Sequence, residues 1–137
     1  MPNLGALRIA IANNLSTIEG VQVSAYMLAN PTPPAIQVMP GPTEYHQTFG
    51  SSGEAEWWEF MVQAFVAATT DFGSQMLLDE MLASEGDRSV KAAIESDRSL
   101  SSQCDDLIVT RRSGYQLYAP DGRAAILGAE WTVRVFT

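Results

Sequence analysis

The chain has 137 residues, and 16 Asp and Glu against 8 Lys and Arg give it a net charge of −8. This length suffices for one buried core, whereas the acidic balance argues against nucleic-acid binding, which uses a basic surface. The stretch Trp57–Ala68 is too short for a membrane helix, the N-terminus lacks the basic region of a signal peptide, and the single Cys104 excludes an internal disulfide.

The first predicted element is an amphipathic helix that ends at Glu19-Gly20, because glycine readily adopts the conformation that terminates a helix. Its apolar stripe recurs every three or four residues and consists of Leu4, Leu7, Ile11, Leu15 and Ile18. Alternation predicts a strand over 21–26. The prolines of 30–34 form a connector to a short strand over 35–39. Residues 43–53 are polar and contain glycine, which predicts an exposed, flexible loop.

Residues 56–68 are the most informative strand candidate. One face carries Trp58, Phe60 and other apolar residues, while the other face is mixed and includes Trp57 and Met61. Such a strand would be about 43 Å long, so it should bend or project beyond the domain. A helix is the competing interpretation, but the aromatic and β-branched content favours a strand.

The rest of the chain predicts two helices and then three strands. The helices cover 70–83 and 90–96, and the strands cover 107–110, 115–118 and 125–136. Arg111-Arg112-Ser113-Gly114 is predicted to be a turn between two of these strands. The order α-β-β-β-α-α-β-β-β predicts one α+β domain over residues 1–137. Its sheet should be antiparallel or mixed, with the helices packed on one face.

No arrangement of residues predicts catalysis. His46 is the only histidine, and Glu44 could orient it as a general base, but a polar pair is the simpler interpretation. Cys104 precedes Asp105-Asp106, whose charges oppose thiolate formation. We therefore predict a protein that is not an enzyme and has no catalytic, cofactor-binding or metal-binding residues.

Several residues are instead candidates for a protein interface. Adjacent residues of a strand face opposite ways, so Trp58 is predicted in the core, and Trp57 either contacts a partner or is covered within the monomer. The arginine pair could contact nucleic acid, lie in a solvated turn or form ion pairs at an interface; we favour the interface. The predicted interface residues are Tyr45, His46, Phe49, Trp57, Arg111, Arg112 and Tyr115.

The order and spacing of these segments resemble the tail terminator proteins of long-tailed bacteriophages, also called tail-to-head joining or tail completion proteins. The resemblance spans nearly the whole chain. Its segments are Leu7–Ala10, Ile18–Val23, Pro33–Val38, Glu44–His46, Trp58–Ala68, Asp71–Ala83 with Leu78-Asp79, Gly86–Ile94, Asp97–Asp106 and Trp131–Val133.

The resemblance implies a structural virion protein at the tail–head junction, assembled in the host cytoplasm. It implies a homohexameric ring that caps the tail tube, stops its polymerisation and binds the connector or stopper protein of the head. DNA would pass through the ring without specific binding. Three alternatives remain open: another neck or head–tail adaptor protein, a small acidic hydrolase using Glu44 and His46, and a monomeric peptide-binding module.

Overall fold

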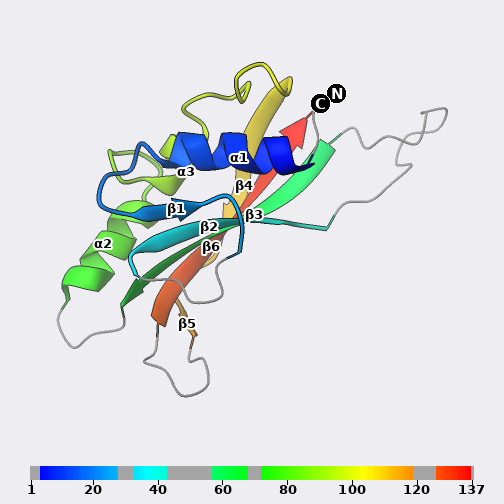
Figure 1. Cartoon of the computed structure of the whole chain (residues 1–137). Coiled ribbons are helices and arrows are strands. Elements are labelled where there is room, and N and C mark those ends of the chain that lie inside the picture. Colours follow the sequence, from blue (N-terminus) through cyan, green and yellow to red (C-terminus); the bar gives the residue numbers. More distant parts are fainter. Residues whose placement is uncertain (1–3, 28–32, 43–56, 68–71, 119–125, 137) are drawn as a thin grey trace.

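The computed structural model describes residues 4–27, 33–42, 57–67, 72–118 and 126–136. Three helices and six strands follow one another in the predicted order (Figure 1). They are α1 (Leu4–Leu15), β1 (Gln22–Ser24), β2 (Ala35–Pro40), β3 (Trp57–Ala67), α2 (Gly73–Leu82), α3 (Val90–Ile94), β4 (Asp106–Arg112), β5 (Gln116–Tyr118) and β6 (Ile126–Phe136). The predicted α+β class is confirmed. The predicted loop over 43–53 lies outside the described residues.

The six strands form one mixed sheet in the order β1-β2-β3-β6-β4, and β5 also pairs with β6. β1 and β2 are parallel, and all other pairs are antiparallel. The longest ladder joins β3 to β6 over 11 residues, from Trp57 opposite Phe136 to Ala67 opposite Ile126. This ladder confirms the long predicted strand and excludes its helical alternative.

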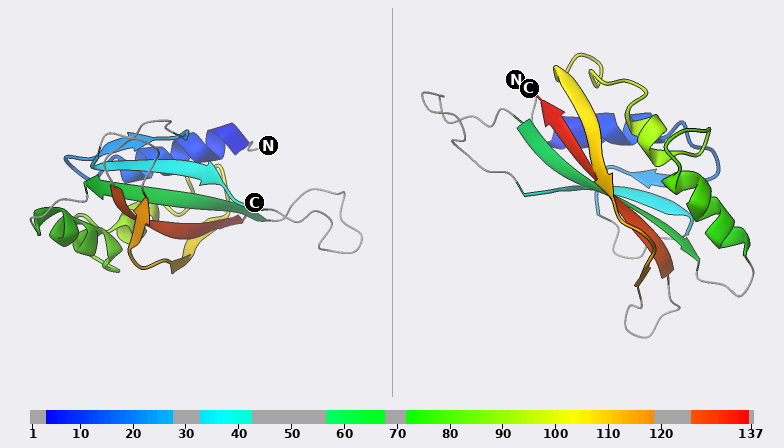
Figure 2. Two further views of the ribbon diagram at one scale, coloured as in Figure 1. Left: turned by 90° about the horizontal axis from the view of Figure 1, so that it is seen from below. Right: turned by 180° about the vertical axis from the view of Figure 1, so that it is seen from behind.

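The three helices lie on one face of the sheet, as predicted (Figure 2). Helix α1 contacts β1 and β2, α2 contacts β3 and β6, and the short α3 contacts α1 and α2. Alternate side chains of the central strands point toward this helical layer and are buried, among them Phe60, Val62, Trp131 and Val133. The core therefore lies between the helices and a single face of the sheet.

The predicted apolar stripe is correct for α1 except at Leu4. For α2 the spacing predicts a stripe of Phe72, Met76, Leu77, Glu80 and Met81, which is wrong in part. In and just after α1, Leu7, Ile11, Leu15 and Ile18 are buried, while Leu4 at the first position is exposed. In α2 the buried residues are Leu78 and Met81, whereas Phe72 and Met76 are 72% and 62% exposed. Phe72 precedes the helix, and packing against the sheet selects the face that carries Leu78 and Met81. None of the described helices is long and apolar enough to cross a membrane.

The connection from α3 to β4 contains three successive left-handed residues. Leu100, Ser101 and Ser102 have φ of 49°, 57° and 68°, a region that L-residues seldom occupy. The Asp97 carboxylate accepts hydrogen bonds from the amides of Ser99 and Ser101, at 3.1 and 2.9 Å. These bonds, with that from Ser101 contributing most, lower the pKa of Asp97. The turn places the Leu100 side chain in the core.

The expected turn at Arg111–Gly114 is partly wrong, because both arginines belong to β4. The pairing of β4 with β6 shifts register between Val109 and Arg111, which leaves Thr110 as an extra residue in the strand. After this bulge the ladder continues, and Arg112 lies opposite Trp131. The sequence predicted a strand that ends at residue 110, because the bulge interrupts the regular alternation of inward- and outward-facing residues at that point.

Candidate assembly surface

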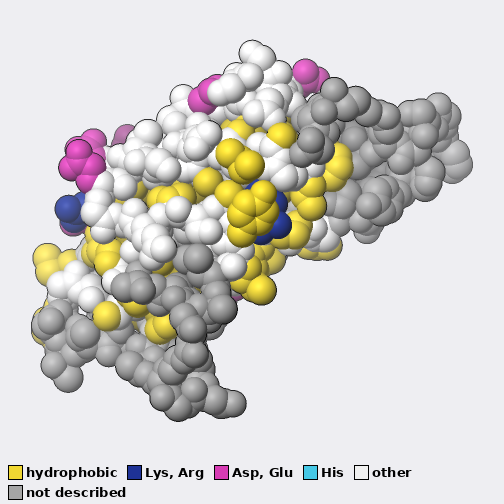
Figure 3. Space-filling model, in the orientation of Figure 1, with side chains coloured by type: hydrophobic (Ala, Val, Ile, Leu, Met, Phe, Trp, Pro, Cys, Tyr) yellow, Lys and Arg dark blue, Asp and Glu magenta, His cyan; other side chains and the backbone are white. Residues whose placement is uncertain are grey.

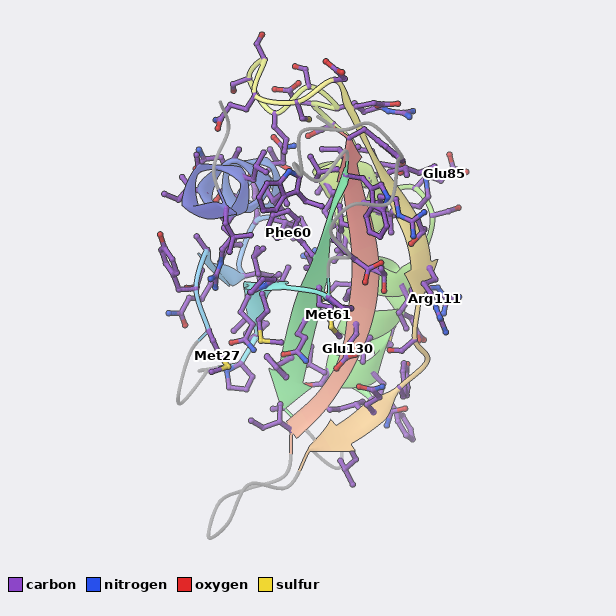
Figure 4. All side chains as sticks on the ribbon, turned by 90° about the vertical axis from the view of Figure 1, so that its right-hand side faces the viewer. Met27, Phe60, Met61, Glu85, Arg111 and Glu130 are labelled. Carbon is purple, nitrogen blue, oxygen red and sulfur yellow. The ribbon has the colours of Figure 1, made fainter. Side chains whose placement is uncertain are left out.

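The face of the sheet opposite the helices carries a mixed set of side chains, which we call the outer sheet face. It comprises Gln37, Met39, Trp57, Glu59, Met61, Gln63, Glu130, Thr132 and Arg134, contributed by β2, β3 and β6. Figure 4 looks toward this face, with the labelled Met61 and Glu130 on it and Phe60 beside α1. Most of these side chains are half-buried. The alternation of the two central strands thus separates an apolar core face from a face of large apolar and charged groups.

Trp57 lies at one end of this face and stacks against an arginine. The Arg134 guanidinium lies 4.3 Å from the centre of the Trp57 ring, a cation–π distance. Arg134 is directly opposite Glu59 in the ladder, and their charged groups are 3.8 Å apart. The Arg134 Nε atom is buried without a hydrogen-bond partner. Trp57, Glu59 and Arg134 therefore form one ordered cluster, in which tryptophan and arginine are residue types enriched at protein interfaces.

A hydrogen-bonded polar row crosses the middle of the outer sheet face. The Gln37 amide donates to Gln63 Oε1, and the Gln63 amide donates to Glu130 Oε1, each at 2.7 Å. At its end, the backbone of Glu130 exchanges hydrogen bonds with Ser113, whose amide donates to the Glu130 carbonyl and whose hydroxyl accepts from the Glu130 amide. Since these partners lie directly opposite one another, the row specifies the register of β2, β3 and β6.

Side chains occupy backbone donors along the edge strand β4. The Leu107 amide donates to the Asp106 carboxylate at 2.9 Å, and the Val109 amide donates to the Glu95 carboxylate at 3.0 Å. Glu95 also accepts from Lys91 at 2.6 Å. Burial alone would raise the pKa of Glu95, but the bonds from Lys91 and Val109 lower it below its usual value. This arrangement covers part of an edge that could otherwise pair with another strand.

The predicted interface residues do not form one patch in the structure. Trp57 lies opposite Phe136, and Arg112 lies opposite Trp131, five residues away along β6 and therefore about 17 Å distant. Arg111 and Arg112 are exposed at the far end of β4. Tyr45, His46 and Phe49 lie outside the described residues, as does Glu44 of the hydrolase alternative.

Tyr115 has a contact within the monomer that the sequence did not predict. Its hydroxyl donates to the Asp79 carboxylate of α2, and the Gln75 carbonyl oxygen is 3.1 Å away. The bond to Asp79 raises the pKa of Tyr115 to about 12. Tyr115 thus joins the segment between β4 and β5 to α2.

Cys104 has the weakly acidic thiol predicted for it, although the main cause is different. Burial contributes most, and the charges of Asp106, Asp105 and Asp97 add to it, so that the pKa of Cys104 rises to about 11. Its sulfur lies 3.4 Å from the Arg98 carbonyl oxygen. The prediction rested on the neighbouring acids alone, because the sequence does not show that Cys104 is partly buried in its polar segment.

Alternation predicts Gln63 on the mixed face of one strand and Glu130 and Arg134 together on one face of the last strand. The sequence did not predict that these two strands pair, which joins the three residues in one face. Among the described residues, no three His, Cys, Asp or Glu side chains are grouped so that they could hold a metal ion.

No protein-family model matches the chain, and no curated protein is significantly similar to it.

Proposed function

We propose that this chain is a structural virion protein that assembles into a ring at the head-proximal end of a phage tail tube. The ring ends tube polymerisation and joins the tail to the head connector or stopper protein. The tail terminator identity comes from the order and spacing of segments along the sequence. The observation that carries the proposal is the outer sheet face, because the helices cover only the opposite face.

The composition of the outer sheet face supports a role in assembly. Trp57, Met39 and Met61 are half-buried on this face, and Trp57 stacks on Arg134. Interfaces are enriched in tryptophan, methionine and arginine. A ring uses two different patches on each copy, which repeat around the closed assembly. In the proposed ring, the outer sheet face is one of these two patches.

The acidity of the chain supports the second part of the proposal, a conduit that does not retain DNA. Six copies would carry 6 × −8 = −48 formal charges. In the view of Figure 3, acidic side chains lie along the upper and left borders, whereas apolar side chains gather across the middle. Acids that face the lumen would repel DNA phosphates. A surface potential calculated for a solved ring tests this proposal, and a basic lumen would refute it.

The mass of the purified protein in solution is the primary test. Mass photometry and negative-stain electron microscopy should give a six-chain ring, alone or after addition of the tail tube protein. The same protein should shorten or stop tube polymerisation when it is added to growing tubes. A chain that remains monomeric at all concentrations and in the presence of tubes would refute the proposal. Binding to the head connector without any effect on tubes would identify an adaptor protein of the neck instead.

Two adjacent tryptophans provide a matched pair of variants. Trp57→Ala removes the ring that stacks on Arg134, whereas Trp58→Ala removes a side chain that packs against the core. Trp57→Ala should weaken ring formation with little loss of thermal stability, while Trp58→Ala should lower the melting temperature. Unchanged assembly of Trp57→Ala would show that Trp57 of the outer sheet face takes no part in ring formation.

A further inference from the structure

Arg111 and Arg112 are the cations that the monomer leaves without a long-range partner, among the residues that the structure describes. Arg88, Lys91, Arg98 and Arg134 each lie within 4.0 Å of a carboxylate. Arg8 donates to the carbonyl groups of Ala25 and Val38. Arg112 contacts only the carbonyl of the next residue. In a chain of net charge −8, two adjacent unpaired arginines are therefore an exceptional feature.

The arginine pair borders a groove at the edge strand β4, where Arg112 lies opposite the inward-facing Trp131 and Arg111 lies opposite Thr132 of the outer sheet face. The groove has a volume of about 190 Å³. Its apolar wall includes Leu82 and Trp131, and its polar rim carries Ser84 and Lys91 in addition to the arginines. Lys91 is already paired with Glu95, so Arg111 and Arg112 supply the charge that is not neutralised. We call this hollow the arginine groove.

The chain also presents an exposed acidic turn, formed by Glu85, Gly86 and Asp87. Gly86 has a φ of 115°, which an L-residue rarely adopts, so glycine allows the sharp turn here. Residues of the turn line two hollows of about 460 and 430 Å³. No cation lies within 4.0 Å of either carboxylate in the described part of the chain, since Arg88 pairs with Glu80. Figure 4 shows Glu85 and Arg111 at the same border of the molecule, at separate positions.

We propose that the arginine groove of one copy receives the acidic turn of a second copy. The turn carries two unpaired carboxylates and the groove is bordered by two unpaired arginines, whose guanidinium groups bind carboxylates with two parallel hydrogen bonds. The net charges of two copies repel each other, because both chains are acidic. A specific contact between them therefore requires complementary local charges. The inference deepens the proposed self-assembly by naming one pair of contacting surfaces.

Charge removal tests the groove against a control with the same net charge. R111Q/R112Q has a net charge of −8 − 2 = −10, and so does N13D/Q22E, which changes two exposed residues elsewhere. R111Q/R112Q should weaken self-association at least about tenfold at roughly physiological salt, and N13D/Q22E should do so much less. Circular dichroism should show that both variants are folded. Equal effects of the two variants would overturn the inference.

Charge exchange tests the pairing itself. R111E/R112E and E85R/D87R should each fail to assemble alone, because each places like charges in the contact. A mixture of the two should assemble, because every contact then joins opposite charges. Failure of the mixture to assemble, although wild type does, would overturn the inference, as would normal assembly of R111E/R112E alone.

The mass of the mixed particle separates this inference from the proposed function. Six-chain particles would support both the contact and the ring. Two-chain particles would support the contact, made twice around a twofold axis, and refute the ring. If R111E/R112E instead loses binding to a single-stranded oligonucleotide and keeps its self-association, the groove binds phosphates and the inference is wrong.

Discussion

Glu95 should be a larger contributor to stability than its position near the surface suggests. Its side chain is 16% exposed, accepts from Lys91 at 2.6 Å and accepts from the Val109 amide at 3.0 Å. In Glu95→Ala, the amide of the buried Val109 loses its acceptor, which should cost about 1–3 kcal/mol. Loss of the Lys91 pair adds little, about 0–1 kcal/mol, because Lys91 is 41% exposed.

We therefore expect Glu95→Ala to lower the free energy of unfolding by about 2–3 kcal/mol in urea titrations. Glu95→Gln keeps an oxygen for the Val109 amide and should lose only about 0.5–1 kcal/mol. Lys91→Ala is the matched control and should lose no more than Glu95→Gln. Equal losses in Glu95→Ala and Glu95→Gln would refute the reasoning, because the charge rather than the hydrogen bond to β4 would then dominate.

The pH dependence of the same variants gives an independent check. The pKa of Glu95 is lowered in the folded protein relative to an ordinary value of 4.5. Its stabilising effect is therefore present above pH 4.5 and is lost as the pH falls through the lowered pKa. Since glutamine does not titrate, the difference in stability between wild type and Glu95→Gln should shrink in this acid range. A difference that grows on acidification would contradict the assignment.

Three further predictions concern other parts of the fold. Phe60→Ala should cost about 3–5 kcal/mol and Met61→Ala about 1 kcal/mol in urea titrations, because only Phe60 faces the core; equal costs would contradict this. Cys104 should react slowly with iodoacetamide at neutral pH and faster as the pH approaches about 11, whereas rapid neutral alkylation of the folded chain would exclude the raised pKa. In ultraviolet titrations, Asp79→Asn should lower the pKa of Tyr115 from about 12 toward 10.0, with Tyr115→Phe identifying its signal; no shift would exclude the bond to Asp79.

The element order could be predicted because it depends on local patterns. Apolar residues at helical spacing predicted α1, and the alternation of residues 56–68 predicted β3, since each strand buries one face. Which helical face is buried was less predictable: in α2, packing against the sheet selects Leu78 and Met81 over Phe72 and Met76. Helix propensity and the spacing of apolar residues do not determine which face of α2 packs against the sheet.

The grouping of surface residues depended on strand pairing, which a single sequence does not reveal. Arg111 and Arg112 were predicted in a turn because the bulge before them hides the continuation of β4. The stacking of Arg134 on Trp57 requires the register between β3 and β6. Tyr115 pairs with Asp79, which is 36 residues away in sequence. Each of these contacts crosses elements, so it could be found only once the sheet was known.

The occupied amides of β4 have a consequence for the kind of polymer this chain can form. Leu107 and Val109 give their backbone donors to carboxylates of the same molecule, so another strand cannot add there without displacing them. Addition of strands edge to edge has no intrinsic end and leads to filaments. Contacts between side-chain surfaces can close after a fixed number of copies. A protein proposed to end the growth of a tube thus carries, in Asp106 and Glu95, a barrier to unlimited growth of its own.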